Sequence, residues 1–111
     1  MEYKLFNAFY DKAKESPNCE IFVQTYEQQE QTKKYSAEAL TSIWEIAQKS
    51  PKELRAITAL SQVAFSKLYG IPRRTIENWD SGANAPPPYL VKLIAYALWN
   101  DYDINYKERS L

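Results

Sequence analysis

The sequence predicts an all-α protein, and three observations point to that fold class. Apolar side chains recur at the 3.6-residue spacing of amphipathic helices, and strand-like alternation of apolar and polar residues is scarce. The 111 residues contain only two glycines, Gly70 and Gly82, which flank one short segment. The length suits a single domain, and a hydrophobic content of 45% is enough to build a core.

Three segments of the N-terminal half have helical character. The first, 2–15, places four apolar side chains on one face: Phe6, Phe9, Tyr10 and Ala13. The second, 19–31, alternates like a strand at its start. Its continuation has helical composition and no second strand to pair with, so we favour a helix. In the third, Ser36 is the expected N-cap of a helix over 37–49, whose apolar stripe is Leu40, Ile43, Trp44 and Ala47.

The second half begins with two short helices. Ser50 and Pro51 start a helix that faces inward through Leu54 and Ile57. Ser61 then caps a helix over 62–69, which Gly70 ends by supplying a left-handed backbone. The next helix runs over 72–81, and the proline-rich segment 83–88 is expected to be extended because proline does not fit inside a helix.

The last predicted helix, 89–100, is apolar on more than one face. Its main stripe consists of Leu90, Leu93, Ile94, Ala97 and Leu98, whereas Val91, Tyr96 and Trp99 lie off that stripe. Such a helix packs against two neighbours or against a second subunit. We therefore regard it as the preferred dimerisation element, and the tail after it shows no convincing period.

Composition excludes several classes of function. The chain has no histidine and one cysteine, Cys19, which argues against a zinc site, a disulfide and Ser/His/Asp or Cys/His catalysis. We therefore expect no catalytic residues, no metal and no cofactor. The absence of a signal peptide and of an apolar run of about 18 residues predicts a cytoplasmic protein without a membrane span. The net charge is zero, but all four arginines lie in the second half.

The segment "GIPRRTIENWDSG" carries the functional signal. Arg73 and Arg74 occupy the first turn of a short helix, where the helix dipole is positive and acidic residues would be favoured. The order of a helix opened by Ser61 and Gln62, a turn at Gly70 and a second short helix has helix-turn-helix spacing. The arginines are then explained by an external counter-charge, a DNA phosphate or a guanine edge.

The register resembles the lambda repressor and Cro (XRE-type) helix-turn-helix family. The resemblance covers "PKELRAITALSQVAFSKLYGIPRRTIENWDSGANAPP" and "LVKLIAYAL", about half of the chain. It implies a helix-turn-helix domain over 36–111. The N-terminal helical accessory segment, 1–35, matches nothing in the family, and its aromatic content predicts that it packs on this domain or forms an interface with a partner. Four apolar residues of the two helices are expected in the core: Phe65, Leu68, Ile76 and Trp79.

The resemblance also implies roles for polar residues. The helix over 72–81 would enter the major groove of double-stranded DNA, with Arg73, Arg74 and Asn78 at the base-reading positions. Arginine pairs well with guanine and asparagine with adenine. The candidates for phosphate contacts are Ser61, Gln62, Lys67, Thr75, Ser81 and Asn84. Arg55 and Asp80 correspond to a structural ion pair between the first helix of the family and the end of the recognition helix.

Two functions remain open at this point. The first is a sequence-specific DNA-binding transcriptional regulator, a repressor acting as a homodimer on a pseudo-palindromic operator. The second is an antitoxin-like or mobile-element accessory protein, in which residues 1–50 bind a protein partner. The loop "ANAPPP" departs from the family because it lacks basic residues, and the neutral net charge predicts a shallow salt dependence of DNA binding.

Overall fold

A computed structural model describes residues 1–27 and 36–101, and within these ranges the fold is all-α, as the sequence predicts. The described residues form seven helices and no strand: α1 (Tyr3–Glu15), α2 (Cys19–Glu27), α3 (Ala37–Ala47), α4 (Pro51–Thr58), α5 (Gln62–Tyr69), α6 (Arg73–Ser81) and α7 (Pro88–Asp101). The ambiguous segment that starts at Cys19 is helical. The remainder of that prediction, 28–31, and the predicted tail lie outside the described residues.

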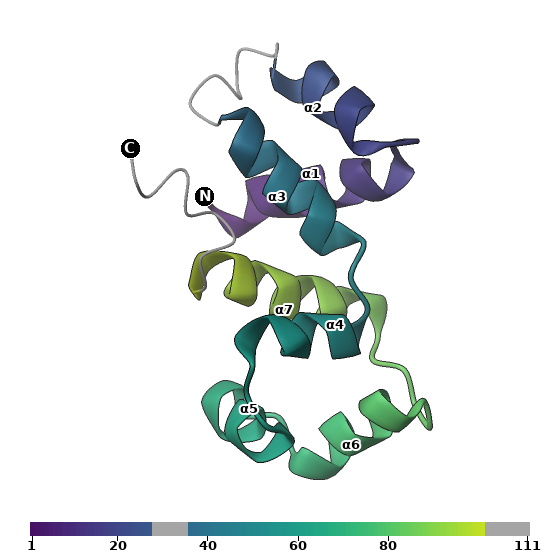
Figure 1. Ribbon diagram of the computed structural model, residues 1–111, viewed down its shortest axis with the longest axis vertical. Helices are drawn as coiled ribbons and strands as arrows, with labels where there is room; N and C mark the ends of the chain where they lie inside the picture. Colours follow the sequence, from purple (N-terminus) through teal and green to yellow (C-terminus); the bar gives the residue numbers. More distant parts are fainter. Residues whose placement is uncertain (28–35, 102–111) are drawn as a thin grey trace.

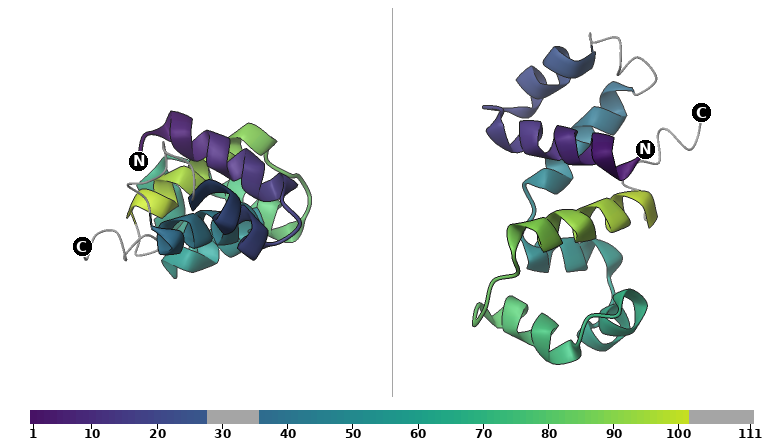
Figure 2. Two further views of the ribbon diagram at one scale, coloured as in Figure 1. Left: turned by 90° about the horizontal axis from the view of Figure 1, so that it is seen from above. Right: turned by 180° about the vertical axis from the view of Figure 1, so that it is seen from behind.

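The helices are arranged in three tiers along the 44 Å long axis of the molecule (Figure 1). Helices α1, α2 and α3 form one end, α4 and α7 cross the middle, and α5 and α6 form the other end. Figure 2 shows the same order from behind. Helix α3 belongs to the predicted 36–111 unit, yet its most extensive contacts are with α1 and α2. The N-terminal segment is therefore an integral part of the packing.

Trp99 lies at the centre of the core. Its ring is fully buried and its centroid is 5.7 Å from that of Phe6, while its Nε1 donates a hydrogen bond of 2.9 Å to Ser42 Oγ. Ser42 Oγ in turn donates to the carbonyl of Ala39. These contacts join α7 to both α1 and α3, and they satisfy the polar atoms that Trp99 and Ser42 carry into the interior.

The wide apolar surface of α7 is explained by neighbours within the chain. Helix α7 contacts α4 as well as α1 and α3. The prediction that the second apolar face of α7 packs against neighbours is confirmed, because α1 and α3 cover the side of the helix that carries Trp99. Leu93, predicted on the stripe, is instead 44% exposed.

The predicted core position of Leu68 is also wrong, since this side chain is 57% exposed. Helix α5 makes its most extensive contacts with a single helix, α6, so it buries only a narrow face. Phe65 fills that face and stacks on Tyr69, one turn later, at a centroid distance of 4.9 Å. Ile76 is buried as predicted, and Trp79 is half-buried against the core.

The helix ends explain where the short helices begin and stop. Ser50 and Glu53 form a capping box at the start of α4, and the Ser61 hydroxyl accepts from the amide of Ala64 at the start of α5. Gly70 and Gly82 adopt φ values of 67° and 82° at the ends of α5 and α6. Most other residue types are strained at such angles, so the two glycines fix the limits of both helices.

Candidate nucleic-acid interface

Helices α5 and α6 form a compact pair at one end of the molecule (Figure 1). Only three residues, 70–72, connect them. The amide of Ile71 donates to the carbonyl of Ser66 at 3.2 Å, and the Ser66 hydroxyl donates back to the carbonyl of Ile71. These bonds hold the turn, so the direction of α6 is fixed relative to α5.

The first turn of α6 concentrates positive charge on an exposed surface. Arg73 and Arg74 are both exposed, no acidic residue occupies this turn, and Pro72 provides no side-chain cap. The positive end of the helix dipole adds to the two guanidinium charges. Ile76 is buried whereas Arg73 and Arg74 are exposed, so the two guanidinium groups are accessible to an anion.

Glu77 is a functional candidate that the sequence interpretation missed. Its Oε1 lies 3.0 Å from Nε of Arg73, an i,i+4 ion pair in which both side chains are about half exposed (61% for Arg73 and 46% for Glu77). The four-residue spacing of opposite charges was the signal that would have predicted this pair. Arg74 forms no ion pair with any residue in the described ranges.

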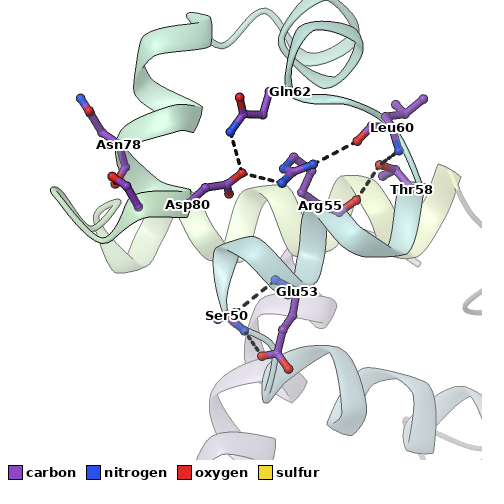
Figure 3. A network of polar contacts seen from close by, with 9 residues as sticks. Ser50, Glu53, Arg55, Thr58, Leu60, Gln62, Asn78 and Asp80 are labelled. Atoms are coloured by element: carbon purple, nitrogen blue, oxygen red, sulfur yellow. Dashed lines mark hydrogen bonds and ion pairs between the residues drawn. The ribbon is translucent and has the colours of Figure 1, made fainter.

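Asn78 lies one turn after Arg74 and is half-buried. Its backbone carbonyl accepts from the Ser81 hydroxyl at 3.2 Å and from the Asn84 amide at 3.3 Å, which fastens the loop after α6 to the end of the helix. Its side chain points away from the Arg55–Asp80 pair (Figure 3). The amide group therefore remains available on the same helix as the two arginines.

The ion pair expected between Arg55 and Asp80 is present and forms the centre of a network (Figure 3). Asp80 Oδ2 accepts from Arg55 Nη2 and, at 2.9 Å, from Gln62 Nε2. Arg55 Nη1 also donates to the carbonyl of Leu60 at 3.1 Å. The network ties α4, the α4–α5 connection, α5 and the end of α6 together, so it sets how α6 is presented.

The network lowers the pKa of Asp80. Burial alone raises this pKa, but hydrogen bonds from Gln62 and Arg55, together with the charges of Arg55 and Lys52, outweigh the burial. Because the folded pKa lies below the unfolded value of about 3.9, the ionised carboxylate stabilises the fold above that pH. The contribution is lost as the pH falls through the lower, folded value.

Asp80→Asn is therefore expected to destabilise the protein near neutral pH by about 2 kcal/mol, since a hydrogen-bonded charge is lost and Arg55 is left unpaired. The difference from the wild type should shrink as the pH falls through the lowered pKa of Asp80 and the carboxylate becomes protonated. Urea unfolding at neutral pH and at an acid pH below that pKa measures it. Asp11→Asn is the matched control, because its ion pair with Lys92 leaves Asp11 53% exposed and is worth at most about 1 kcal/mol. An equal loss for Asp80→Asn at both pH values would contradict the ionic role.

The six phosphate candidates lie at two ends of the α5–α6 pair. Lys67 is exposed in the last turn of α5, and Thr75 is half-buried in the first turn of α6. The other four lie near the start of α5 or the end of α6: Ser61, Gln62, Ser81 and Asn84. Ser61 and Ser81 are exposed but hold backbone groups through their hydroxyls, and the amide of Gln62 is bound to Asp80. Lys67 is the charged member of the set, and it forms no ion pair with any of the described residues. It also lies close in sequence to Arg73.

The described part of the chain shows neither a metal-binding cluster nor a membrane-spanning helix. Residues 1–27 and 36–101 contain no group of three or more cysteine, aspartate or glutamate side chains placed to hold a metal ion. Within the same ranges, none of the helices has the length and apolar character needed to cross a bilayer. Comparison of the chain with models of protein families, with curated proteins and with solved structures found no match.

Proposed function

We propose that the protein is a sequence-specific DNA-binding regulator that inserts the N-terminal half of α6 into the major groove. The observation that carries this proposal is the exposed first turn of α6, where Arg73 and Arg74 lie at the positive end of the helix and no acidic residue occupies that turn. A helix with this charge arrangement is suited to an external polyanion.

The chemistry of the side chains assigns separate roles to them. Arg73 and Arg74 are suited to the O6 and N7 atoms of guanine, and Asn78 to the N6 and N7 atoms of adenine. Lys67 and Thr75, at the same end of the α5–α6 pair, would contact phosphates and fix the register on the duplex. Glu77 would accept from cytosine N4, or it would hold Arg73 in the orientation needed for its base.

A homodimer would present two copies of α6 to successive major grooves, which calls for a palindromic operator with half-sites about one helical turn apart. A repressor in the cytoplasm is the simplest such regulator. Because the net charge of the chain is zero, the attraction for DNA would come from the basic side chains around α6. Few phosphates would then be neutralised, so the salt dependence of binding would be shallow.

The alternative, a protein partner bound through residues 1–50, has less support. It was motivated by the aromatic side chains near the N-terminus. Four of these are buried in the intramolecular core: Phe6, Phe9, Tyr10 and Phe22. Ile21 is the large apolar side chain that stays exposed in α1 and α2, at 44%. One exposed side chain is normal for a protein surface and does not indicate an interface.

Selection of bound fragments from sheared genomic DNA tests the proposal. The purified full chain is mixed with the fragments at moderate salt, and the retained DNA is sequenced. We expect one enriched motif with two-fold symmetry, whose half-site spacing gives the separation of the two α6 helices. Retention without enrichment, with uniform release as salt rises, would contradict sequence-specific binding and would favour the protein-partner alternative.

A further inference from the structure

We propose that a groove on the side of the molecule, distant from the exposed face of α6, binds a small organic anion: a carboxylate, sulfonate or phosphate carried on a flat apolar body. The groove has a volume of about 710 Å³ and is formed by three segments of the chain. These are the second half of α1, the α3–α4 connection, and the α6–α7 connection with the start of α7. The inference does not rest on DNA binding.

The location brings together segments far apart in the sequence. The α3–α4 connection passes beside the start of α7 (Figure 1). Residues 10–14, 48–53 and 85–92 supply the lining, so the groove lies between α1 and the middle tier of α4 and α7. A volume of this size falls within the range of about 300–1,000 Å³ that is typical of small-molecule sites. This size favours a small molecule over a folded partner.

One wall of the groove is apolar and accessible. Pro86, Pro88 and Val91 line it, together with Tyr89, which is 67% exposed. An aromatic ring with this exposure has no core to pack against, and its face is free for a planar ligand. The prolines fix the backbone of this wall, so the surface is formed before a ligand arrives.

The lining of the groove also carries an excess of positive charge. Three lysines line the groove, Lys14, Lys49 and Lys92, against two carboxylates, Asp11 and Glu53. Asp11 lies 2.7 Å from Lys92, and the Glu53 carboxylate is bonded to the backbone amide of Ser50. Within residues 1–27 and 36–101, Lys14 and Lys49 form no ion pair.

Tyr10 lies between the cations and supplies a second observation. The ring is 96% buried, with the ammonium groups of Lys14 and Lys92 at 5.7 and 5.6 Å from its centroid. Burial, followed by the charge of Asp11, raises the pKa of Tyr10, so its hydroxyl remains a protonated donor. The Tyr10 hydroxyl makes no hydrogen bond to any of the described residues, although the Tyr10 side chain lines the groove. An anion beside Lys14 and Lys49 would accept from it.

Fluorescence titration with 8-anilinonaphthalene-1-sulfonate tests the inference, because this probe joins a sulfonate to flat rings. N-phenyl-1-naphthylamine has the same rings without the charge and is the matched probe. We expect the sulfonate to bind the folded full chain at one site, about tenfold more tightly than the neutral probe, as one charge-assisted hydrogen bond would give. Equal affinity for the two probes would overturn the anion site, because it would show that only the apolar surface of the groove binds them.

Variants locate the site. Lys49→Gln is expected to weaken sulfonate binding about tenfold and to leave the neutral probe unaffected, and Tyr10→Phe to weaken it severalfold. Lys52→Gln removes the same charge just outside the groove and should change neither probe. Wild-type affinity in Lys49→Gln would overturn the assignment. An Arg73→Ala/Arg74→Ala variant should bind the sulfonate normally, and loss of binding there would place the probe on α6 instead of the groove.

Discussion

Replacing Trp99 by alanine is expected to cost about 3–5 kcal/mol of the free energy of unfolding, because the largest fully buried side chain is removed. A chain of this size has a total stability of roughly 5–15 kcal/mol, so the variant would lose a large fraction of its stability. The loss should be larger than at most other positions, since Trp99 contacts Phe6 on α1 and Ser42 on α3 from its place on α7.

Two comparisons separate packing from the hydrogen bond of Trp99. Trp99→Phe retains a buried ring but leaves Ser42 without its donor, so it should lose less than the alanine variant. Trp79→Ala removes a half-buried tryptophan that packs on the core from α6, and it should also lose less. Urea unfolding followed by circular dichroism measures all three. An alanine variant at Trp99 that loses less than Trp79→Ala would show that the core is centred elsewhere.

The sequence predicted the fold class because helical periodicity and capping are local properties. The Ser61 cap, the Gly70 and Gly82 ends and the inward face of Ile76 depend on residues within a few positions of each other. The ion pair between Arg55 and Asp80 is not local, and the resemblance to a known register supplied it. Local pattern and the resemblance together were sufficient to predict that α4, α5 and α6 are helices and approximately where each begins and ends.

The burial of particular side chains was harder to predict because it depends on neighbours from distant parts of the chain. Leu68 has the right spacing for a core residue, but α5 buries only a narrow face against α6. Trp99 lies off the main stripe of α7, and it is buried because α1 and α3 cover that side. Helical periodicity gives the direction of a side chain but not which partner will lie there.

The same limit applies to the candidate site. Arg74 lies two residues before the buried Ile76 and is directed to another side of the helix, so its exposure could be predicted from helical periodicity. The hydrogen bond from Gln62 to Asp80 joins side chains on two helices, which no local pattern brings together, so the sequence did not predict it. The groove beside Tyr10 comes from three distant segments, and no short motif marks it.

Replacing both Arg73 and Arg74 by alanine is expected to abolish specific DNA binding while the fold remains intact. Each arginine–guanine pair is worth roughly 1–3 kcal/mol of discrimination, so loss of both should weaken binding to the selected motif by at least about 30-fold. The structural cost is small, since the Arg73–Glu77 ion pair is exposed and is worth about 0.3–0.5 kcal/mol. Binding isotherms on the selected motif and on a scrambled duplex measure the effect.

The control for that experiment must remove the same charge without touching α6. Lys4→Ala/Lys12→Ala does so, because both lysines are exposed on α1, at the opposite end of the molecule (Figure 1). If α6 reads the bases, this control lowers affinity for both duplexes slightly and preserves their ratio, whereas the arginine variant brings the ratio towards one. Equal losses in the two variants would mean that net charge alone drives binding. The ratio of the two affinities therefore distinguishes a recognition helix from a basic surface.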